Sequence, residues 1–310
     1  MDLSYAQNLE DYHLARVFEG QESGFYIDVG AGHPVADNVS FHFYLQGWRG
    51  IVVEPQERLC ALYEHLRPRD IAASLLIGVE SGRAKFHEVD RLHGFSTTVE
   101  RHARGAAKFG ASFRTSRKFV LTLASLCEAH RVEEIDFLKV DVEGAEADVL
   151  KSGDWKAFRP KVVVVEAIAP GSNQPSWEDW EPFLLAQGYH FMLFDTLNRF
   201  YVAEEAKDVA TRFPRERAPW DSVRHMYEIG RAPENASHPE HALAGILARG
   251  FWASLPHLDR ALLADVLERG RTPANTVAVD AALQALDTED FRARLGRIAC
   301  GYDGGQIYKE

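Results

Sequence analysis

The sequence predicts an α/β protein in which a mostly parallel sheet is covered by helices, ends in an antiparallel hairpin and is followed by a helical appendage. Three observations support this prediction. Short apolar runs rich in β-branched and aromatic residues alternate with helix-like stretches through about residue 203. The runs are nearly continuous in their hydrophobicity, which is typical of strands buried on both faces. From Glu204 onward, helical periods are broken by six prolines. We therefore expect a first domain at residues 1–203 and a mainly helical appendage at residues 204–310.

The elements of the first domain follow from these runs in chain order. Helices are expected over Asn38 to Gln46, from Pro55 to Pro68, and over Val142 to Lys151, because apolar residues recur there at helical spacing. The expected strands are Phe25 to Val29, Gly50 to Glu54, Ile71 to Ile77, Phe119 to Leu123, Phe137 to Val140 and Val162 to Glu166.

Two further runs, Tyr189 to Phe194 and Phe200 to Ala203, are joined by the segment Asp195 to Arg199. This connection is too short for a helical crossover, so the two strands should form an antiparallel hairpin. A mostly parallel sheet that ends in this way differs from the ordinary two-halved dinucleotide fold. In the appendage, Ala242 to Leu255 and Ala261 to Leu267 are amphipathic enough to pack on the first domain or on a second copy of the chain in a homodimer.

Composition and charge restrict the classes of partner. The 310 residues include 46% hydrophobic and 26% charged residues, which is close to the average of a soluble globular protein. The formal charge of −11 repels nucleic acid at long range, so we expect a small-molecule or glycan partner and no nucleic acid. The three cysteines, Cys60, Cys127 and Cys300, are far apart and show no CxxC spacing.

These cysteines indicate neither a disulfide framework nor a zinc site, and they suit a reducing compartment. No apolar run approaches the roughly 18 residues that a membrane-spanning helix needs. The first residues carry acidic side chains and lack a basic segment followed by an apolar stretch. We therefore expect a cytoplasmic protein with no membrane span.

A glycine turn follows the first long strand. The segment Phe25 to Gly32 places Asp28, Gly30 and Gly32 where the strand ends, and glycines there let the backbone turn sharply and approach a ligand. Glu54 ends the next strand, 22 residues after Gly32, about where nucleotide-binding folds place the acid that accepts hydrogen bonds from ribose hydroxyls. The pair predicts a nucleoside site.

The residues after the turn favour one nucleoside over another. A dinucleotide fingerprint needs a third glycine, but Val35 occupies that position and Pro34 lacks an N–H that could serve a pyrophosphate. An acid at Asp28 would repel a diphosphate and suit the ammonium group of a methionine moiety. S-adenosylmethionine is therefore the better ligand, and NAD is disfavoured.

Acidic residues also end two later strands. Phe137 to Val140 leads into Asp141 and Glu143, and Glu166 ends the next run, so the sheet should bring these carboxylates to one edge. They have two uses that the sequence leaves open. Asp141 and Glu166 can ligate a hard divalent cation such as Mg²⁺, or the carboxylates can hold a substrate hydroxyl while a base removes its proton. His33, directly after the glycine turn, is an alternative base because an unperturbed histidine titrates near pH 6.5.

Five blocks occur in order over about residues 4 to 203 and together carry a family resemblance. They are Ser4 to Asp11 (SYAQNLED), Phe25 to Gly32 (FYIDVGAG), Trp48 to Pro55 (WRGIVVEP), Gly94 to Thr97 (GFST) and Phe137 to Glu146 (FLKVDVEGAE). With these blocks the chain resembles the FkbM family of S-adenosylmethionine-dependent methyltransferases. The resemblance implies a class I methyltransferase (Rossmann-like) fold, a mostly parallel seven-stranded sheet whose last strand is antiparallel. It does not extend to residues 204–310.

The resemblance also implies an activity, namely O-methylation of a hydroxyl on a sugar, glycolipid or polyketide-like acceptor with S-adenosylhomocysteine as the product. It implies further that the methionine and ribose end of the cofactor lies at Asp28, Gly30 and Gly32, and that the ribose lies on Glu54. Two residues of the N-terminal segment, Gln7 and Asp11, would then cover the pocket. The chain departs from the commoner pattern by carrying His33 and Pro34 where many members have asparagine or aspartate.

The expected mechanism is direct in-line displacement, in which the acceptor oxygen attacks the sulfonium methyl group. Asp141 would position or deprotonate the hydroxyl with help from Glu143, Glu166 or a divalent cation, and His33 is the alternative base. Two rival hypotheses are a nicotinamide-dependent oxidoreductase, against which the missing third glycine argues, and a non-catalytic nucleoside-binding or scaffolding protein whose appendage is the working surface.

Overall fold

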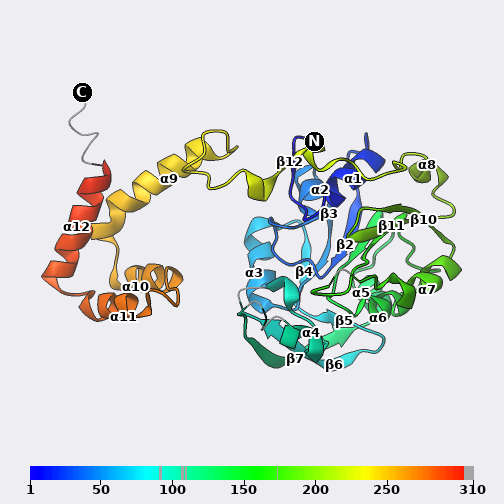
Figure 1. Cartoon of the computed structure of the whole chain (residues 1–310), viewed down its shortest axis with the longest axis horizontal. Helices are drawn as coiled ribbons and strands as arrows, with labels where there is room; N and C mark the ends of the chain where they lie inside the picture. Colours follow the sequence, from blue (N-terminus) through cyan, green and yellow to red (C-terminus); the bar gives the residue numbers. More distant parts are fainter. Residues whose placement is uncertain (91–92, 106–107, 109, 173, 304–310) are drawn as a thin grey trace. The chain divides into compact units, whose positions relative to one another are not determined.

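A seven-stranded sheet forms the centre of the first compact unit, Met1–Met226 (Figure 1). The computed structural model of the chain describes residues 1–90, 93–105, 108, 110–172 and 174–303. In spatial order the strands of the sheet are β10 (Tyr189–Phe194), β11 (Asn198–Ala203), β9 (Val162–Glu166), β8 (Phe137–Val140), β2 (Phe25–Val29), β3 (Arg49–Val53) and β4 (Ile71–Ala73).

The directions of the strands confirm the predicted hairpin. β4, β3, β2, β8 and β9 pair in parallel, whereas β11 is antiparallel both to β9 and to β10. β11 therefore lies between its two neighbours in the sheet, although it is the last of these strands in the chain. The hairpin closes through Asp195, which accepts hydrogen bonds from the backbone N–H groups of Leu197 and Asn198.

Continuous apolar runs become strands buried on both faces, as predicted. The four valines from Val162 to Val165 have no exposed surface, and Ile27, Ile51 and Leu138 on three adjacent strands are equally buried. These three residues share one register, since Ile27 pairs with Ile51 on one side and with Leu138 on the other. This row of buried side chains fixes how the strand ends align.

Short helices supply the remainder of the core. Leu14, Phe43, Tyr63, Leu126 and Val149, each from a different helix, belong to the same hydrophobic cluster as the central strands. The helices of this unit are α1 (Glu10–Val17), α2 (Phe41–Leu45), α3 (Glu57–Leu66), α4 (Glu100–Gly105), α5 (Leu123–Ala129), α6 (Glu146–Lys151), α7 (Glu181–Ala186) and α8 (Lys207–Ala210).

A separate three-stranded sheet was not predicted. It consists of β5 (Leu76–Ile77), β7 (Phe113–Leu121) and β6 (Gly82–Val89). The predicted strand Ile71 to Ile77 divides between β4 and β5. The predicted strand Phe119 to Leu123 overlaps the end of β7, which stops at Leu121 and lies outside the main sheet, and Leu123 begins α5. One face of the small sheet is solvated, so Phe119 is 60% exposed while Phe86 is buried.

The boundary between the two compact units lies between Met226 and Tyr227, later than the predicted boundary at residue 203. Residues 204–226 belong to the first unit, because Val209 and Phe213 enter its main core. In addition, β1 (Leu3–Ser4) pairs in parallel with β12 (Arg224–His225). A strand pair that joins the two ends of a unit could not be inferred from two-residue segments.

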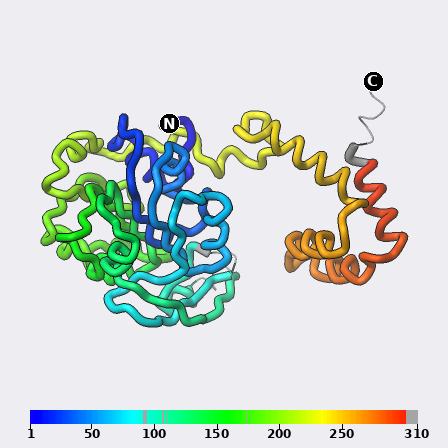
Figure 2. Tube along the Cα trace, turned by 180° about the vertical axis from the view of Figure 1, so that it is seen from behind, coloured from blue at the N-terminus to red at the C-terminus, as the bar shows by residue number. Residues whose placement is uncertain are grey.

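The second unit, Tyr227–Glu310, is mainly helical over the residues that the structure describes, and residues 304–310 lie outside them. Figure 2 follows this part of the chain in yellow through red. Its helices are α9 (His241–Ser254), α10 (Arg260–Arg269), α11 (Thr276–Ala285) and α12 (Glu289–Asp303). Leu255, Leu263, Leu286, Phe291 and Leu295 form a core of its own. Among the described residues, no helix combines the length and apolar character that crossing a membrane requires.

Candidate functional site

A cavity of about 450 Å³ opens at the carboxyl ends of the central strands. Its position follows from the topology. The chain runs from β2 outward to β3 and β4 and later returns to β8 on the other side of β2, so the connections diverge between β2 and β8. Open α/β sheets bind ligands at such a switch point. The volume lies within the range of small-molecule sites, about 300 to 1,000 Å³.

The glycine turn after β2 forms one wall of the cavity. Gly30 and Gly32 adopt φ angles of +80° and +61°, in the left-handed region that favours glycine. The N–H groups of Gly30 and Ala31 donate to the carbonyl oxygen of Val53, at 2.9 and 3.1 Å, so the turn is tied to β3. A Cβ atom on Gly30 would lie 1.7 Å from the carbonyl oxygen of Asp141. The turn is therefore closed in between β3 and β8 and has no room for a side chain at Gly30.

Glu54 lies beside this turn, as its spacing predicts. Its carboxylate accepts hydrogen bonds from the N–H of Gly32 at 2.9 Å and from the N–H of Gln56 at 2.7 Å. The residue is only 4% exposed, and burial raises its pKa to about 7. Each carboxylate oxygen can accept more than one hydrogen bond, so the group can also serve a ligand in the cavity that it lines.

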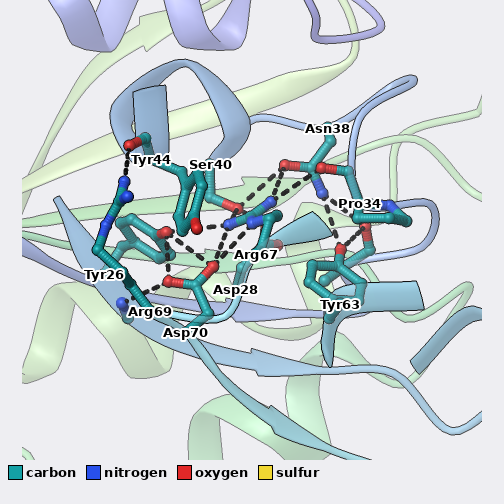
Figure 3. Close-up of polar contacts among 12 residues, drawn as sticks. Tyr26, Asp28, Pro34, Asn38, Ser40, Tyr44, Tyr63, Arg67, Arg69 and Asp70 are labelled. Atoms are coloured by element: carbon teal, nitrogen blue, oxygen red, sulfur yellow. Dashed lines mark hydrogen bonds and ion pairs between the residues drawn. The ribbon is translucent and has the colours of Figure 1, made fainter. Parts of the chain in front are cut away.

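Asp28 is placed differently from the expectation that it meets a ligand. It is buried, it is not among the residues that line the cavity, and its Oδ2 accepts a hydrogen bond from Ser40 Oγ at 2.6 Å. Ser40 Oγ in turn accepts from Arg67 Nη2 at 2.9 Å. Figure 3 shows that Asp28 belongs to a polar network around Arg67. In this structure Asp28 holds Ser40 and does not line the cavity.

Arg67 is the centre of that network and has no exposed side-chain surface. Its guanidinium forms an ion pair with Asp70 at 2.6 Å and donates to Asn38 Oδ1 at 2.8 Å and to the Pro34 carbonyl oxygen at 3.2 Å. Asn38 donates onward to the carbonyl oxygen of Ala31 in the glycine turn. Arg67 thus fixes the turn from β2 to α2 by contacts that no local sequence pattern indicates.

Of the two residues of the N-terminal segment that are expected at the cavity, Gln7 and Asp11, the structure places only Gln7 there. Gln7 lines the cavity, whereas Asp11 is fully buried and does not. Asp11 accepts hydrogen bonds from Ser4 Oγ at 2.6 Å, from the N–H of Tyr5 at 2.7 Å and from the N–H of Ala6 at 3.3 Å. Burial raises its pKa to about 7. Asp11 therefore holds the segment that carries Gln7.

The predicted meeting of carboxylates at one edge of the sheet is confirmed. Asp141, Glu143 and Glu166, which we call the carboxylate cluster, each offer an oxygen atom, and these atoms all lie within 4.8 Å of one another. All three residues line the cavity. The Oε2 atom of Glu166 is buried and has no hydrogen-bond partner.

Crowding of these acids changes their proton affinity. Burial, with a further contribution from Asp141, raises the pKa of Glu143 to about 9. The pKa of Glu166 also lies well above its ordinary value, because the residue is buried and because Asp141 and Glu143 are close. Without a ligand, Glu143 therefore holds its proton at pH values where an isolated glutamate releases it, and the pKa of Glu166 is shifted in the same direction.

Lys139 is a site residue that the sequence reasoning missed. Its Nζ donates to Asp141 Oδ2 at 2.6 Å, and the residue is 6% exposed and lines the cavity. Burial alone would lower its pKa, but Asp141 and Asp28 raise it above the usual value. The ammonium group therefore stays charged and offsets part of the negative charge of the carboxylate cluster. The sequence indicates this role only by placing a charged residue inside the otherwise apolar run Phe137–Val140.

The backbone around Glu143 is unusual and is supported by the Gly94 to Thr97 region and α4. Glu143 has φ of +56°, which costs a residue with a Cβ about 1 to 2 kcal/mol. Its carbonyl oxygen accepts hydrogen bonds from Thr97 Oγ1 at 2.9 Å and from His102 Nδ1 at 3.0 Å. These two hydrogen bonds hold the backbone of Glu143, whose side chain lines the cavity. Thr97 therefore supports the position of Glu143 in the site.

His33 lines the cavity, as expected. Its Nδ1 accepts hydrogen bonds from the N–H groups of Val35 at 3.2 Å and Ala36 at 3.1 Å. Because Nδ1 accepts these hydrogen bonds, the proton of the neutral imidazole lies on Nε2, which is a hydrogen-bond donor. The histidine also occupies the N–H groups that follow the glycine turn.

A comparison with protein families identifies the chain. The sequence model described as the methyltransferase FkbM domain matches residues 28–191, more than half of the chain. The matched region includes the glycine turn, Glu54 and the whole carboxylate cluster. Searches of the curated proteins and of the solved structures gave no significant match. With this domain built around the cavity, the chain belongs to the FkbM methyltransferase family.

Proposed function

We propose that this methyltransferase transfers the methyl group of S-adenosylmethionine to a hydroxyl of a sugar, glycolipid or polyketide-like acceptor. The single observation that carries the cofactor assignment is the contact between Gly32 and Glu54. It sets a buried carboxylate beside a glycine turn in a cavity of about 450 Å³. A carboxylate in this position accepts hydrogen bonds from adjacent ribose hydroxyls.

The residues after the turn support a sulfonium nucleoside over a dinucleotide. A pyrophosphate would need free backbone N–H groups at the start of the following segment. Here the N–H groups of Val35 and Ala36 donate to His33 Nδ1, and Pro34 has none. The glycine turn also leaves the backbone bare where a ligand approaches it. These features suit a nucleoside whose remaining portion carries no diphosphate.

The cofactor supplies an activated methyl group on a good leaving group, so the chain need not form a covalent bond with either reactant. Its task is alignment, exclusion of water and removal of one proton. The acceptor oxygen forms the new C–O bond as the C–S bond breaks, and the hydroxyl proton leaves to a base of the protein. We assign the base to Asp141, which Lys139 holds in place. His33 is the alternative base, and to accept the proton its Nδ1 must exchange the N–H groups of Val35 and Ala36 for the acceptor hydroxyl.

Calorimetric titration of the full chain with S-adenosylhomocysteine and with NAD tests the cofactor. We expect the first to bind at one site per chain and the second not to bind. Glu54→Ala should weaken the binding by about 1 to 3 kcal/mol, because a hydrogen-bonding charged group is lost. Glu57→Ala, which removes an 81% exposed carboxylate on α3, serves as the matched control and should leave affinity unchanged. Binding of NAD in place of the nucleoside would overturn the proposal.

Methyl transfer from labelled cofactor to a panel of hydroxylated acceptors tests the reaction. Asp141→Asn should retain affinity for S-adenosylhomocysteine and reduce turnover, because the amide cannot accept the hydroxyl proton. Unchanged turnover would show that Asp141 is not the base and would favour His33 in that role. The same panel, with no methylated product from any acceptor, would favour a non-catalytic binding role.

A further inference from the structure

The carboxylate cluster holds more acidic groups than the cations around it can balance once all three are ionised. Asp141, Glu143 and Glu166 each bring an oxygen atom within 4.8 Å of the others, and Lys139 forms an ion pair with Asp141. The adjacent acid Glu146 accepts hydrogen bonds from the N–H groups of Val142 and Gly144 and is satisfied by the backbone. With all three cluster acids ionised, the cluster and Lys139 together keep two uncompensated negative charges at the cavity.

A second observation comes from a single atom. Glu166 Oε2 is buried against the cavity wall and has no hydrogen-bond partner. A buried carboxylate oxygen without a partner is costly, and in folded proteins such atoms are nearly always satisfied. Glu166 ends β9 while Asp141 follows the neighbouring strand β8, so the sheet itself holds the two groups side by side. Glu166 Oε2 is therefore positioned by the end of a strand of the main sheet and not by a loop.

The spacing of the oxygen atoms suits a metal ion. Two oxygens on opposite sides of one ion lie up to about 5 Å apart for Ca²⁺, with bonds of roughly 2.3 to 2.6 Å, and about 4 Å apart for Mg²⁺, with bonds near 2.1 Å. The cluster oxygens, within 4.8 Å of one another, already meet the first limit. Small side-chain rotations would meet the second. Oxygen ligands of this kind are those that hard divalent cations prefer.

We propose that Asp141, Glu143 and Glu166 bind one divalent cation, and that its remaining coordination positions face the cavity and are available to oxygen atoms of the acceptor. Three protein ligands leave about three positions of a six-coordinate ion open. A cation here displaces the protons of the cluster, compensates the two negative charges of the fully ionised acids, provides the missing partner of Glu166 Oε2 and lowers the pKa of a coordinated hydroxyl. The effect on the pKa of a coordinated hydroxyl rests on the proposed function. The cation site itself does not rest on it.

The cation site is tested by titrating the full chain with Mn²⁺ in the absence of any nucleoside, with electron paramagnetic resonance reporting free Mn²⁺. We expect one site per chain. Glu166→Gln and Asp141→Asn should each weaken it by about tenfold or more, because each removes a charged ligand. Glu128→Gln, which removes an exposed carboxylate on α5, is the matched control and should bind as the wild type does. An absence of binding, or binding that both cluster variants retain, would overturn the site.

Water-proton relaxation on the same samples tests the open positions. Mn²⁺ bound with exchangeable water ligands enhances the relaxation rate, whereas a closed site with only protein ligands does not. Enhancement is the expected result, and its absence would overturn the availability of the ion to an acceptor. Titration with S-adenosylhomocysteine in the presence of EDTA separates the two proposals. Nucleoside binding without any Mn²⁺ site rejects only the cation, and a Mn²⁺ site without nucleoside binding rejects the proposed function.

A protonated amine on the acceptor is the other occupant that such a cluster can attract. The Mn²⁺ titration distinguishes it, because an ammonium group of the size of Lys139 Nζ makes hydrogen bonds rather than coordination bonds. Binding of methylammonium that the wild type and Glu128→Gln share and that Glu166→Gln loses, together with no Mn²⁺ site, would replace the metal ion by an amine. An unchanged affinity of the Glu166→Gln variant for S-adenosylhomocysteine verifies that this variant folds.

Discussion

The backbone of Gly30 approaches that of Asp141 so closely that a Cβ atom on Gly30 would lie 1.7 Å from the Asp141 carbonyl oxygen. Gly30 follows β2 and Asp141 follows β8, so this contact sets the distance between the two walls of the cavity. Gly30→Ala must push the strand ends apart and must also adopt a left-handed φ. We expect the variant to lose about 2 kcal/mol or more of unfolding free energy and to lose nucleoside binding.

Gly20→Ala is a matched control for this substitution. Gly20 has φ of +83°, and a Cβ atom there would meet nothing within 4 Å. It should therefore show only the conformational cost, about 1 to 2 kcal/mol, with unchanged affinity for S-adenosylhomocysteine. Urea unfolding and calorimetry of both variants make the comparison. Equal losses in the two variants would show that the approach to Asp141 has no energetic consequence.

The raised pKa of Glu54 predicts that cofactor affinity depends on pH. Burial raises this pKa to about 7, so the ligand-free folded protein favours the neutral acid. That preference stabilises the fold below the ordinary pKa near 4.5, and the stabilisation is lost as the pH rises through 7. Ribose hydroxyls donate to the ionised form, so binding of S-adenosylhomocysteine should lower the pKa and release a proton.

Affinity should consequently rise by roughly tenfold between pH 6 and pH 8 and then level off. Calorimetry in buffers of different ionisation enthalpy measures the released proton directly. In Glu54→Gln, which cannot titrate, both the release and the pH dependence assigned to this residue should disappear. A pH dependence identical in the variant would assign the titration to another group.

The buried network of Arg67 predicts a large stability effect at a distance from any ligand. Arg67→Met would leave Asp70 without its ion-pair partner and would remove the donor to Asn38. Removing one member of a buried ion pair costs about 3 to 5 kcal/mol. Arg69→Met is the control, since Arg69 is exposed and packs on the Tyr44 ring. Chemical denaturation should show a loss several times larger for Arg67→Met, and equal losses would contradict the network.

Asp11 predicts a local effect on the N-terminal segment. Asp11→Ala removes the acceptor for the N–H groups of Tyr5 and Ala6, so these two amides should exchange their hydrogens faster. Loss of the acceptor should also destabilise the fold by about 1 to 3 kcal/mol. Asp2→Ala, at an exposed position of the same segment, is the control. Hydrogen exchange measured by mass spectrometry should separate the two, and equal protection in both would reject the anchoring role.

The central strands could be predicted from the sequence because burial on both faces leaves a simple pattern. β2, β8 and β9 match their predicted limits, since each is a nearly continuous apolar run with one charged residue. The carboxylate cluster followed from the same reasoning, because parallel strands end at one edge of a sheet. The small sheet escaped prediction, because β6 and β7 mix charged and apolar residues and bury only one face.

The partners of individual buried polar groups could not be predicted. The spacing of Asp28 before two glycines suggested contact with a ligand, but its partner Ser40 lies 12 residues away, and Ser40 is held by Arg67, a further 27 residues on. Lys139 lay inside a predicted strand, where the pattern fixes burial but not which acid pairs with it. Such long-range polar contacts depend on the completed packing, which single-residue propensities do not describe.

The place of β11 in the sheet has a consequence for how the chain matures. Synthesis delivers β10 before β11, yet β11 is the strand that joins β10 to β9. Until residues 198–203 emerge, one side of the valine strand β9 has unpaired backbone groups, and such a surface recruits strands from other molecules. A nascent or truncated polypeptide that stops short of β11 is therefore prone to aggregate. Pairing of β11 with β9 covers the open strand edge, so that other copies of the chain can no longer pair with it.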